Sequence, residues 1–441
     1  MRSWLTGNKL ALALSWIVAV ILVLLPFHAF LTVWLSSAVD HYTLLRLWKE
    51  FLLTIALLGV IFLLFLDKQL RKKIFSLTIV SLIGAYTLLT VIWGTISWLT
   101  GAVTAKALGY GLIVNLRFLL FFILTLVIAT KSRLLARLWP KLLFIPAVAV
   151  VLIGLLQRFI FPYDVLKHFG YGPDTIYAYQ VVNHNIHYPR IMSTLRGANP
   201  LGAYLVLILS SLTVLITRAR KNQLLLWGAF ILAAEALIFS YSRGAWAGLL
   251  LSMLLLLGIS IKDKITKKLL VVGLVVVLVI GIPLAYSLRH NPAFERAFLH
   301  TDKYSEVQKS SNQEHITSFK NGLSDLINEP LGHGVGTAGP ASVYNNSKSR
   351  ISENYFTQIG QELGWLGLAL FIAINFMVAR ELWFRKNDSL ALILLVSFAG
   401  ITAINLVSHA WTDDTLAYIW WGLAGICLSY SVKLNINKPS S

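Results

Sequence analysis

Cysteine is nearly absent from this chain of 441 residues, and charged residues are scarce. The single cysteine, Cys427, excludes a disulfide framework and any metal site built from several cysteines. Charged residues make up 13% of the sequence, hydrophobic residues make up 57%, and the mean hydropathy is +0.72. A water-soluble globular domain does not need so large an apolar fraction. The composition therefore excludes a soluble protein and indicates one that is embedded in a membrane.

Long apolar runs alternate with short connectors along the chain. A run of about 20 apolar residues can cross the hydrocarbon core of a bilayer as a helix. The first run is too long for the core of a cleaved signal peptide and lacks a small-residue cleavage site, so we interpret it as a retained span. The pattern predicts an all-α integral membrane protein with about twelve transmembrane helices, at residues 10–37, 50–66, 74–98, 111–130, 142–160, 198–217, 224–240, 246–261, 269–286, 356–379, 389–408 and 415–432.

The net charge of +19 is distributed unevenly over the connectors. One alternate set of connectors holds 22 of the 38 lysines and arginines but only four carboxylates, those of Asp67, Asp263, Glu381 and Asp388. An excess of lysine and arginine in short connectors marks the cytoplasmic side of a membrane protein. We therefore expect a multi-pass protein of the bacterial cytoplasmic membrane with both termini in the cytoplasm. The lipid bilayer explains the positive charge, and no nucleic-acid partner is expected.

One connector on the opposite side is much longer than the others. Residues 287–355 form a polar segment of 69 residues with seven basic and seven acidic side chains. Functional residues of membrane and soluble proteins alike are concentrated in such loops. The sequence thus divides into transmembrane helices at 1–286, an extracytoplasmic loop with short helices at 287–355, and further helices with a cytoplasmic tail at 356–441. A second connector on this side, 161–196, is also longer than a turn requires.

Three features occur within the large loop. Residues 313–327 carry apolar side chains at helical spacing, which predicts an amphipathic helix that lies on the bundle or acts as a lid. The glycine-rich run 331–339 predicts either a tight turn or a turn that lines a diphosphate, because glycines let backbone N–H groups approach an anion. Glu353 lies at the N-terminal end of the next span. It could be a solvated residue that the helix dipole favours, or it could take part in chemistry.

Three arginines lie at the same membrane surface outside the large loop. Arg190 and Arg196 precede the span at 198–217, and Arg243 lies in a very short connector between two spans. Arginine at membrane depth is costly unless it is paired or lines a polar cavity, and its planar fork suits phosphate oxygens. Snorkelling to lipid headgroups would account for one of these side chains. It accounts poorly for Arg243, whose connector is too short to form a free loop.

Charged side chains inside or beside the apolar runs leave several alternatives open. Arg117 and Glu235 lie within spans and could form an ion pair, or each could contact backbone carbonyls. Asp413 and Asp414 follow the eleventh predicted span and could form a paired-carboxylate site or solvate a turn.

Four short motifs follow one another between residues 190 and 367. They are Arg190…Ser193-Thr194-Leu195…Asn199-Pro200…Tyr204, then Phe239-Ser240-Tyr241-Ser242-Arg243-Gly244-Ala245, then Glu329-Pro330-Leu331-Gly332-His333-Gly334-Val335-Gly336, and finally Glu353-Asn354-Tyr355 with Glu362-Leu363-Gly364-Trp365-Leu366-Gly367. Their order and spacing, the predicted spans and the large loop resemble the O-antigen ligase/polymerase family of bacterial membrane glycosyltransferases.

The resemblance implies a GT-C-like helical fold and a donor glycan carried on undecaprenyl diphosphate, which is transferred to a glycan, lipid or protein acceptor. Arg190 and Arg243 match the arginines that hold the donor diphosphate. Ligases of this family typically carry His-Asn where this chain has Glu353-Asn354, so Glu353 is the predicted catalytic base, because a carboxylate can also accept a hydroxyl proton. The predicted substrate-binding residues are Arg196, Asn199, His333, Asn354 and Tyr355.

We expect an inverting reaction that needs no metal or other cofactor, because two arginines can neutralise a leaving diphosphate. In agreement, the first connector on this side, 39–49, contains Asp40 but no Asp-X-Asp pattern. With glutamate in place of histidine, we favour transfer between lipid-linked glycans, as in a polymerase. The alternatives are a transporter or flippase of lipid-linked glycan and a non-catalytic scaffold. A flippase should have a cationic cavity that reaches both faces, whereas these arginines cluster on one.

Overall fold

A computed structural model describes residues 2–182, 185–219, 221–261, 311–346 and 349–436, together with positions 287 and 291. The predicted span at 269–286 lies outside the described residues, as does most of the predicted loop between 287 and 310. Within the described part, eight helices are long and apolar enough to cross a membrane, and two shorter helices are also apolar. The protein is therefore mostly helical and has the elements of a multi-pass membrane protein. The total of twelve spans, the GT-C-like fold and the three-part division stay predictions.

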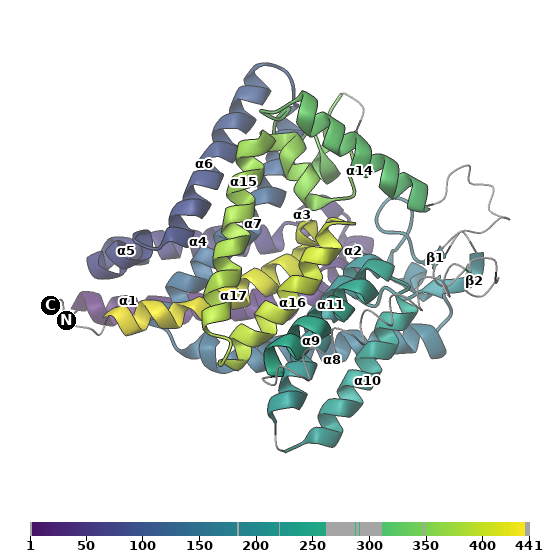
Figure 1. Ribbon diagram of the computed structural model, residues 1–441, viewed down its shortest axis with the longest axis horizontal. Coiled ribbons are helices and arrows are strands. Elements are labelled where there is room, and N and C mark those ends of the chain that lie inside the picture. The colour runs from purple at the N-terminus through teal and green to yellow at the C-terminus, as the bar shows by residue number, and fades with distance from the viewer. Residues whose placement is uncertain are drawn as a thin grey trace.

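The predicted spans within the described part correspond to helices whose ends differ from the prediction by a few residues in most cases (Figure 1). The first half contains α1 (Arg2–Leu24), η1 (Leu25–Phe27), α2 (His28–Val39), α3 (Tyr42–Leu45), α4 (Trp48–Leu66), α5 (Lys68–Phe75), α6 (Thr78–Leu99), α7 (Ala105–Lys131), α8 (Leu134–Phe159), η2 (Val165–Phe169), β1 (Gln180–Val182) and β2 (Asn185–Arg190). The second half contains α9 (Ala198–Arg218), α10 (Gln223–Phe239), α11 (Arg243–Ser260), α14 (Ser311–Asn328), η5 (Gly339–Tyr344), α15 (Tyr355–Phe384), α16 (Ser389–Asn405), η6 (Ala410–Thr412) and α17 (Asp414–Ile436).

The first predicted span is interrupted near its middle. α1 ends at Leu24, the 3-10 turn η1 follows, and α2 begins at His28. Pro26 lies in this turn and has no backbone N–H, so it cannot continue the helical hydrogen-bond ladder. The carbonyls at the break accept from side chains instead: Thr415 Oγ1 donates to Leu25 O at 3.0 Å, and Thr194 Oγ1 donates to Pro26 O at 2.7 Å. The break therefore joins the first helices to α17 and to the segment before α9.

The core of the bundle is the pair α7 and α17, which pack along much of their length. Their contact is lined by buried aromatic side chains: the rings of Phe121 and Tyr418 are 4.9 Å apart, and those of Phe118 and Trp421 are 5.4 Å apart. A Cβ atom on Gly425 would lie 2.4 Å from a carbonyl oxygen of α7, so glycine permits this close approach. Packing of this kind holds helices together in a membrane, where lipid removes the hydrophobic driving force.

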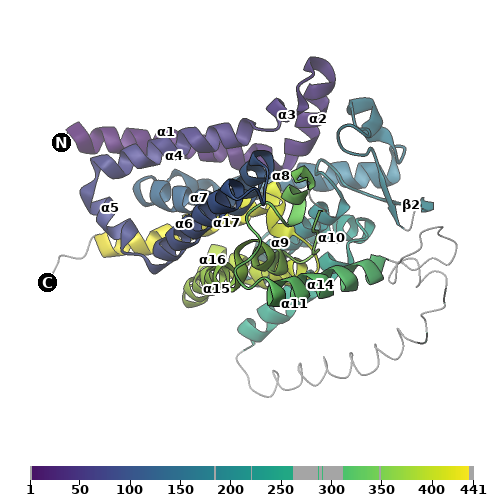
Figure 2. The same ribbon diagram turned by 90° about the horizontal axis from the view of Figure 1, so that it is seen from above.

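The connectors with their own structure lie together at one end of the bundle, which we call the loop face (Figures 1 and 2). It carries η2, α14, η5 and the antiparallel hairpin of β1 and β2, in which Gln180 pairs with Arg190. The hairpin is a short exception to the expected all-α fold. The start of α1 and the end of α17 lie at the opposite end of the bundle (Figures 1 and 2).

The amphipathic helix predicted at 313–327 is α14, which packs on α15. Leu326 is buried, and a Cβ atom on Gly360 of α15 would lie 2.5 Å from its Cδ1 atom. The predicted apolar stripe is largely exposed, since only Leu326 of its members is buried; the exposed members are Ile316, Phe319, Leu323 and Ile327. The prediction of a helix on the bundle is therefore right, but its contact face is narrower than the stripe.

Candidate functional site

The segment that carries Arg190 is fixed against two helices, α8 and α10. Ile191 N donates to Phe239 O at 3.1 Å, which places the end of β2 against the end of α10. Ser193 has a φ of 54°, uncommon for a residue other than glycine, and its Oγ donates to Val150 O of α8 at 2.6 Å. Gln157 holds the same residue from both sides, because its side chain bonds both Ser193 N and Ser193 O. The segment before α9 is thus rigidly positioned.

Arg190 is half-buried and makes its hydrogen bonds with neutral oxygens. Its Nε donates to Ser240 O at 2.9 Å, and its Nη2 donates to Asn199 Oδ1 at 2.6 Å. Burial and the nearby charge of Arg243 lower the pKa of Arg190 to about 10. Arg243, the residue whose charge acts on Arg190, is also a cation. Two neighbouring cations in a partly buried site are suited to bind an anion.

Arg243 is the first residue of α11 and reaches this place because α9 and α11 approach closely. A Cβ atom on Gly202 of α9 would lie 2.6 Å from Ser242 Cβ and 2.9 Å from Ala245 Cβ. Only small residues allow this contact, which lies just after the segment 190–199. The N-terminus of a helix adds partial positive charge next to the guanidinium group. Sequence analysis identified both arginines, and the structure brings them together across 53 positions of the chain.

Arg196 and Asn199 line a polar cavity of about 380 Å³ on the loop face, which we call the His409 cavity. Arg196 Nε lies 3.2 Å from Asp413 Oδ2, and Asn199 is the residue that binds Arg190. The cavity therefore begins beside the arginine pair. Its other lining residues include Gln180, Pro340, Ile404, Ser408, His409 and Asp413.

Asn354 contacts Leu406, which directly follows α16, and Glu353 is its neighbour in the chain. Asn354 caps α15: its Oδ1 accepts from Thr357 N at 3.0 Å, and its Nδ2 donates to Leu406 O at 3.0 Å. Glu353 has a φ of 51°, a conformation that costs free energy for a side chain of this type. Strained residues of this kind cluster at functional sites. The buried Asn354 thus positions Glu353, and its own polar atoms are engaged by the protein.

The two remaining predicted substrate-binding residues differ in their surroundings. His333 is exposed on the loop face, with Nδ1 3.5 Å from Glu329 Oε2. Tyr355 is completely buried, packs against Phe371 with ring centroids 5.5 Å apart, and lies near Asn115. A side chain enclosed by the core cannot contact a substrate without unpacking the helix. Tyr355 therefore has a packing role in this structure, and its expected substrate contact stays a prediction.

The glycine-rich run 331–339 forms a tight turn against the kink of α15. His333 N donates to Gln361 O at 2.8 Å, and Gly334 N donates to Glu362 O at 3.0 Å. Gly336 N donates to the buried carboxylate of Glu362 at 2.8 Å. Several of the N–H groups that would bind an anion thus have protein acceptors. This geometry favours the tight turn over the diphosphate-lining turn.

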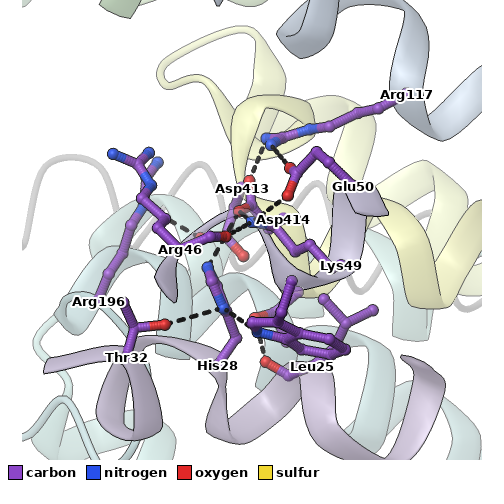
Figure 3. A network of polar contacts seen from close by, with 12 residues as sticks. Leu25, His28, Thr32, Arg46, Lys49, Glu50, Arg117, Arg196, Asp413 and Asp414 are labelled. Carbon is purple, nitrogen blue, oxygen red and sulfur yellow. Dashed lines mark hydrogen bonds and ion pairs between the residues drawn. The ribbon is translucent and has the colours of Figure 1, made fainter. Parts of the chain in front are cut away.

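A network of charged side chains lies beneath the loop face, where α2, α4, α7 and α17 meet (Figure 3). Lys49, with 1% of its side chain exposed, places Nζ 2.9 Å from Asp414 Oδ2 and 3.0 Å from Glu50 Oε2. Arg117 pairs with Asp414, lies 3.5 Å from Glu50, and donates to Thr412 O at 2.7 Å. Buried charges are tolerated in a membrane when they are paired in this way.

His28 completes the network from the start of α2. Trp48 Nε1 can only donate a hydrogen bond, and it lies 2.9 Å from His28 Nδ1. The proton of the neutral ring is therefore on Nε2, which lies 3.5 Å from Asp414 Oδ2. Figure 3 shows His28, Lys49 and Arg117 directed toward Asp414.

These contacts correct two interpretations of the sequence. Arg117 forms ion pairs with Asp414 and Glu50, so the ion pair suggested with Glu235 is wrong. The alternative, that Arg117 contacts a backbone carbonyl, is confirmed by its hydrogen bond to Thr412 O. Asp413 and Asp414 line one cavity but pair with different cations, Asp413 with Arg196 and Asp414 with Lys49 and Arg117. Sequence reasoning missed Lys49, Glu50 and His28. Their signal was the presence of ionisable residues at the ends of apolar runs, where charge is costly.

An apolar groove of about 530 Å³ lies between α8, α9 and α10. Val148, Leu152, Ile208, Leu225 and Gly228 are among its lining residues. The groove and the arginine pair are connected by α10, because Ser240, which accepts from Arg190, follows the same helix. The twelve residues from Gly228 to Ser240 span about 18 Å along the helix axis.

The fold and the site define a multi-pass membrane protein with a polar, arginine-bearing site at one end of its helix bundle. The sequence model of the O-antigen ligase family matches residues 228–372, from α10 to α15. The match supports the O-antigen ligase/polymerase family and confirms the resemblance for the three motifs that contain Arg243, His333 and Glu353; the motif that contains Arg190 lies outside the matched residues. A comparison with curated proteins found no match.

Proposed function

We propose that this protein is a glycosyltransferase that moves a glycan from undecaprenyl diphosphate to an acceptor hydroxyl, with the loop face on the extracytoplasmic side of the cytoplasmic membrane. The observation that carries the proposal is the convergence of Arg190 and Arg243 beside a polar cavity. A scaffold protein has no need of this costly arrangement. An enzyme that must stabilise a diphosphate leaving group does.

The two guanidinium groups bind the diphosphate of the donor. Each guanidinium can donate to phosphate oxygens in its planar fork, and two neighbouring cations suit an anion that carries more than one negative charge. Negative charge on the diphosphate grows as its bond to the sugar breaks. Fixed cations therefore stabilise the transition state more than the bound substrate, and this difference accelerates the reaction.

The apolar groove between α8, α9 and α10 accommodates part of the polyprenyl chain. Its lining is made largely of aliphatic side chains, and it lies along the helix whose end binds Arg190. A lipid-linked donor needs a polar surface at the loop face for its diphosphate and an apolar surface within the bilayer for its hydrocarbon chain. The arrangement supports a lipid-linked donor over a soluble nucleotide sugar.

The reaction we propose is a direct displacement at the anomeric carbon. The acceptor hydroxyl attacks this carbon from the face opposite the diphosphate, Glu353 takes the hydroxyl proton, and a new C–O bond forms. The bond between the anomeric carbon and the diphosphate oxygen breaks, and undecaprenyl diphosphate leaves. The configuration inverts because bond formation and bond cleavage occur on opposite faces. The His409 cavity holds the reacting sugar between the arginine pair and Glu353.

A transfer assay in reconstituted vesicles tests the proposal against a transporter. The donor is the lipid-linked glycan fraction extracted from a strain that lacks this protein, supplied with acceptor on the outer face alone. We expect covalently extended or transferred glycan, separated by gel electrophoresis, only with vesicles that contain the protein. Movement of the donor across the bilayer without a new covalent product would contradict the proposal and favour the flippase.

Replacing Glu353 with glutamine is expected to reduce transfer by about 10²-fold or more, because a positioned general base contributes about 10²–10⁴-fold. Glutamine keeps the size of the side chain but cannot accept the proton. The matched control is Glu329→Gln on the same face, where Glu329 pairs with Arg350 at 2.7 Å; its rate should stay within a few-fold of the wild type. Full activity of Glu353→Gln would exclude Glu353 as the base.

A further inference from the structure

A second polar cavity lies on the loop face, on the other side of the ion pair between Arg196 and Asp413. It has a volume of about 320 Å³, and we call it the Tyr42 cavity. Its walls come from α2, α3, the connector between η2 and β1, and the start of α17. All of these segments lie outside residues 228–372, so the family match assigns no role to them. The lining residues that matter below are Ala29, Tyr42, Arg46, Thr175, Tyr177 and Gln180.

The charges around the Tyr42 cavity are balanced. Two arginines, Arg46 and Arg196, and two aspartates, Asp413 and Asp414, line it. Each has a partner within the protein: Arg196 pairs with Asp413, Arg46 donates to Tyr110 Oη at 2.8 Å, and Asp414 is held by the buried cations. An anionic ligand would meet the aspartates, and a cationic ligand would meet the arginines. An uncharged ligand avoids both repulsions.

The polar groups of the lining suit a ligand that is rich in hydroxyl groups. A hydroxyl both donates and accepts a hydrogen bond, so it can use guanidinium donors and carboxylate acceptors that lie next to each other. Thr32 and Thr175 add neutral hydroxyls. Tyr42 and Tyr177 supply aromatic surface against which an apolar ring face can pack, and Tyr177 is 68% exposed. Aromatic surface with balanced polar groups is the chemistry that recognises an uncharged sugar ring.

The Tyr42 cavity adjoins the reacting site. It shares Gln180, Arg196 and Asp413 with the His409 cavity, and the His409 cavity begins at Asn199 beside Arg190. Gln180 Oε1 accepts from Ala198 N at 2.9 Å, which fixes the shared wall to the start of α9. A sugar in the Tyr42 cavity therefore lies next to the sugar at the reaction centre.

We propose that the Tyr42 cavity is a subsite for an uncharged sugar unit of a glycan substrate. The assignment rests on the proposed glycosyltransferase function. The unit belongs either to the acceptor glycan or to the donor glycan beyond its reacting sugar, and both present the same chemistry to the cavity.

The first experiment measures sugar binding directly and does not require transfer. Purified protein in nanodiscs, which avoid detergents with sugar headgroups, is examined by saturation-transfer NMR. The probes are the methyl glycosides of glucose, galactose and N-acetylglucosamine, with glucuronate as the charged comparison. We expect saturation of the neutral probes by the wild type and its loss in Ala29→Trp, which fills the cavity. Ala38→Trp, at an exposed position of the same helix, is the matched control and should retain the signal.

The second experiment assigns the unit to one substrate. In the vesicle assay, Tyr177→Ala and Ala29→Trp are compared with Tyr179→Ala, whose ring packs on Tyr163 and does not line the cavity. Donor and acceptor fractions are titrated separately. We expect at least a 10-fold rise in KM for one of them, with kcat within about two-fold. A rise for the acceptor fraction places the acceptor glycan in the cavity, and a rise for the donor fraction places the donor glycan there.

Two results would overturn the subsite. One is the absence of a neutral-probe signal that depends on Ala29, and the other is an unchanged KM for both substrates in both cavity variants. Failure of the glycosyltransferase proposal looks different: the wild type then forms no covalent product, while the NMR measurement still reports whether the cavity binds sugars.

Discussion

Replacing Arg243 with alanine is expected to lower glycan transfer by about 10²–10³-fold, the effect of removing one fixed group that stabilises developing negative charge. Arg190→Ala should have an effect of the same size, because Arg190 Nε bonds Ser240 O, three positions before Arg243, and the charge of Arg243 acts on Arg190. Arg243→Lys should recover part of the rate, since it keeps the charge but loses the planar fork. Initial rates in the vesicle assay measure these losses.

Inorganic pyrophosphate provides a readout of the arginine pair that is independent of turnover. Binding to the folded state alone raises stability by RT ln(1 + [L]/Kd), about 2.7 kcal/mol at a concentration of 100 Kd. We expect pyrophosphate to raise the thermal unfolding temperature of the wild type and of Arg71→Ala, a control at an exposed arginine on α5. The shift should be absent in Arg190→Ala and Arg243→Ala. An equal shift in all four proteins would show that the anion binds elsewhere.

The helices of this protein could be predicted from the sequence because the bilayer restricts the possibilities. A chain in hydrocarbon must satisfy its backbone groups internally, so an apolar run of sufficient length is a helix. The predicted span 198–217 thus corresponds closely to α9. The break at Pro26 was missed because the apolar run continues through it, and composition alone does not reveal where a helix is interrupted.

The partners of charged residues could not be predicted in the same way. Arg117 and Glu235 both lie in apolar runs, which made them candidate partners. The packing of α7 against α17 instead places Arg117 next to Asp414, which is 297 positions farther along the chain. Helix packing decides such contacts, and periodicity carries no information about which helices meet. Arg190 and Arg243 were identified by motif and chemistry, yet their proximity depends on the close contact at Gly202, which only the structure shows.

Local structure also redirected the roles of motif residues. Asn354 and Tyr355 belong to the same motif as Glu353, but the backbone turns at Glu353, so that Asn354 caps α15 and Tyr355 enters the core. A sequence motif alone does not show which of its residues caps a helix and which enters the core. The positive φ of Glu353 is the structural sign of this division of roles.

Replacing Asp414 with asparagine is expected to destabilise the protein by about 3–5 kcal/mol, the cost of breaking a buried ion pair by removing one partner. Asparagine keeps the shape of the side chain but removes its negative charge. Within the described network, Glu50 is then the carboxylate that remains for the buried Lys49 and Arg117. The expected observations are a lower thermal unfolding temperature in nanodiscs and a smaller yield of folded protein.

The contrast between buried and exposed ion pairs makes this expectation specific. Asp67→Asn is the matched control: Asp67 pairs with Lys131 at a partly exposed position and caps α5 through Leu70 N, a cap that asparagine can also form. Its cost should be at most about 1 kcal/mol. Adding Lys49→Met to Asp414→Asn should recover part of the lost stability, because the uncompensated cation is then removed. If Asp414→Asn is no more destabilising than Asp67→Asn, the buried ion pairs of the network do not stabilise the fold.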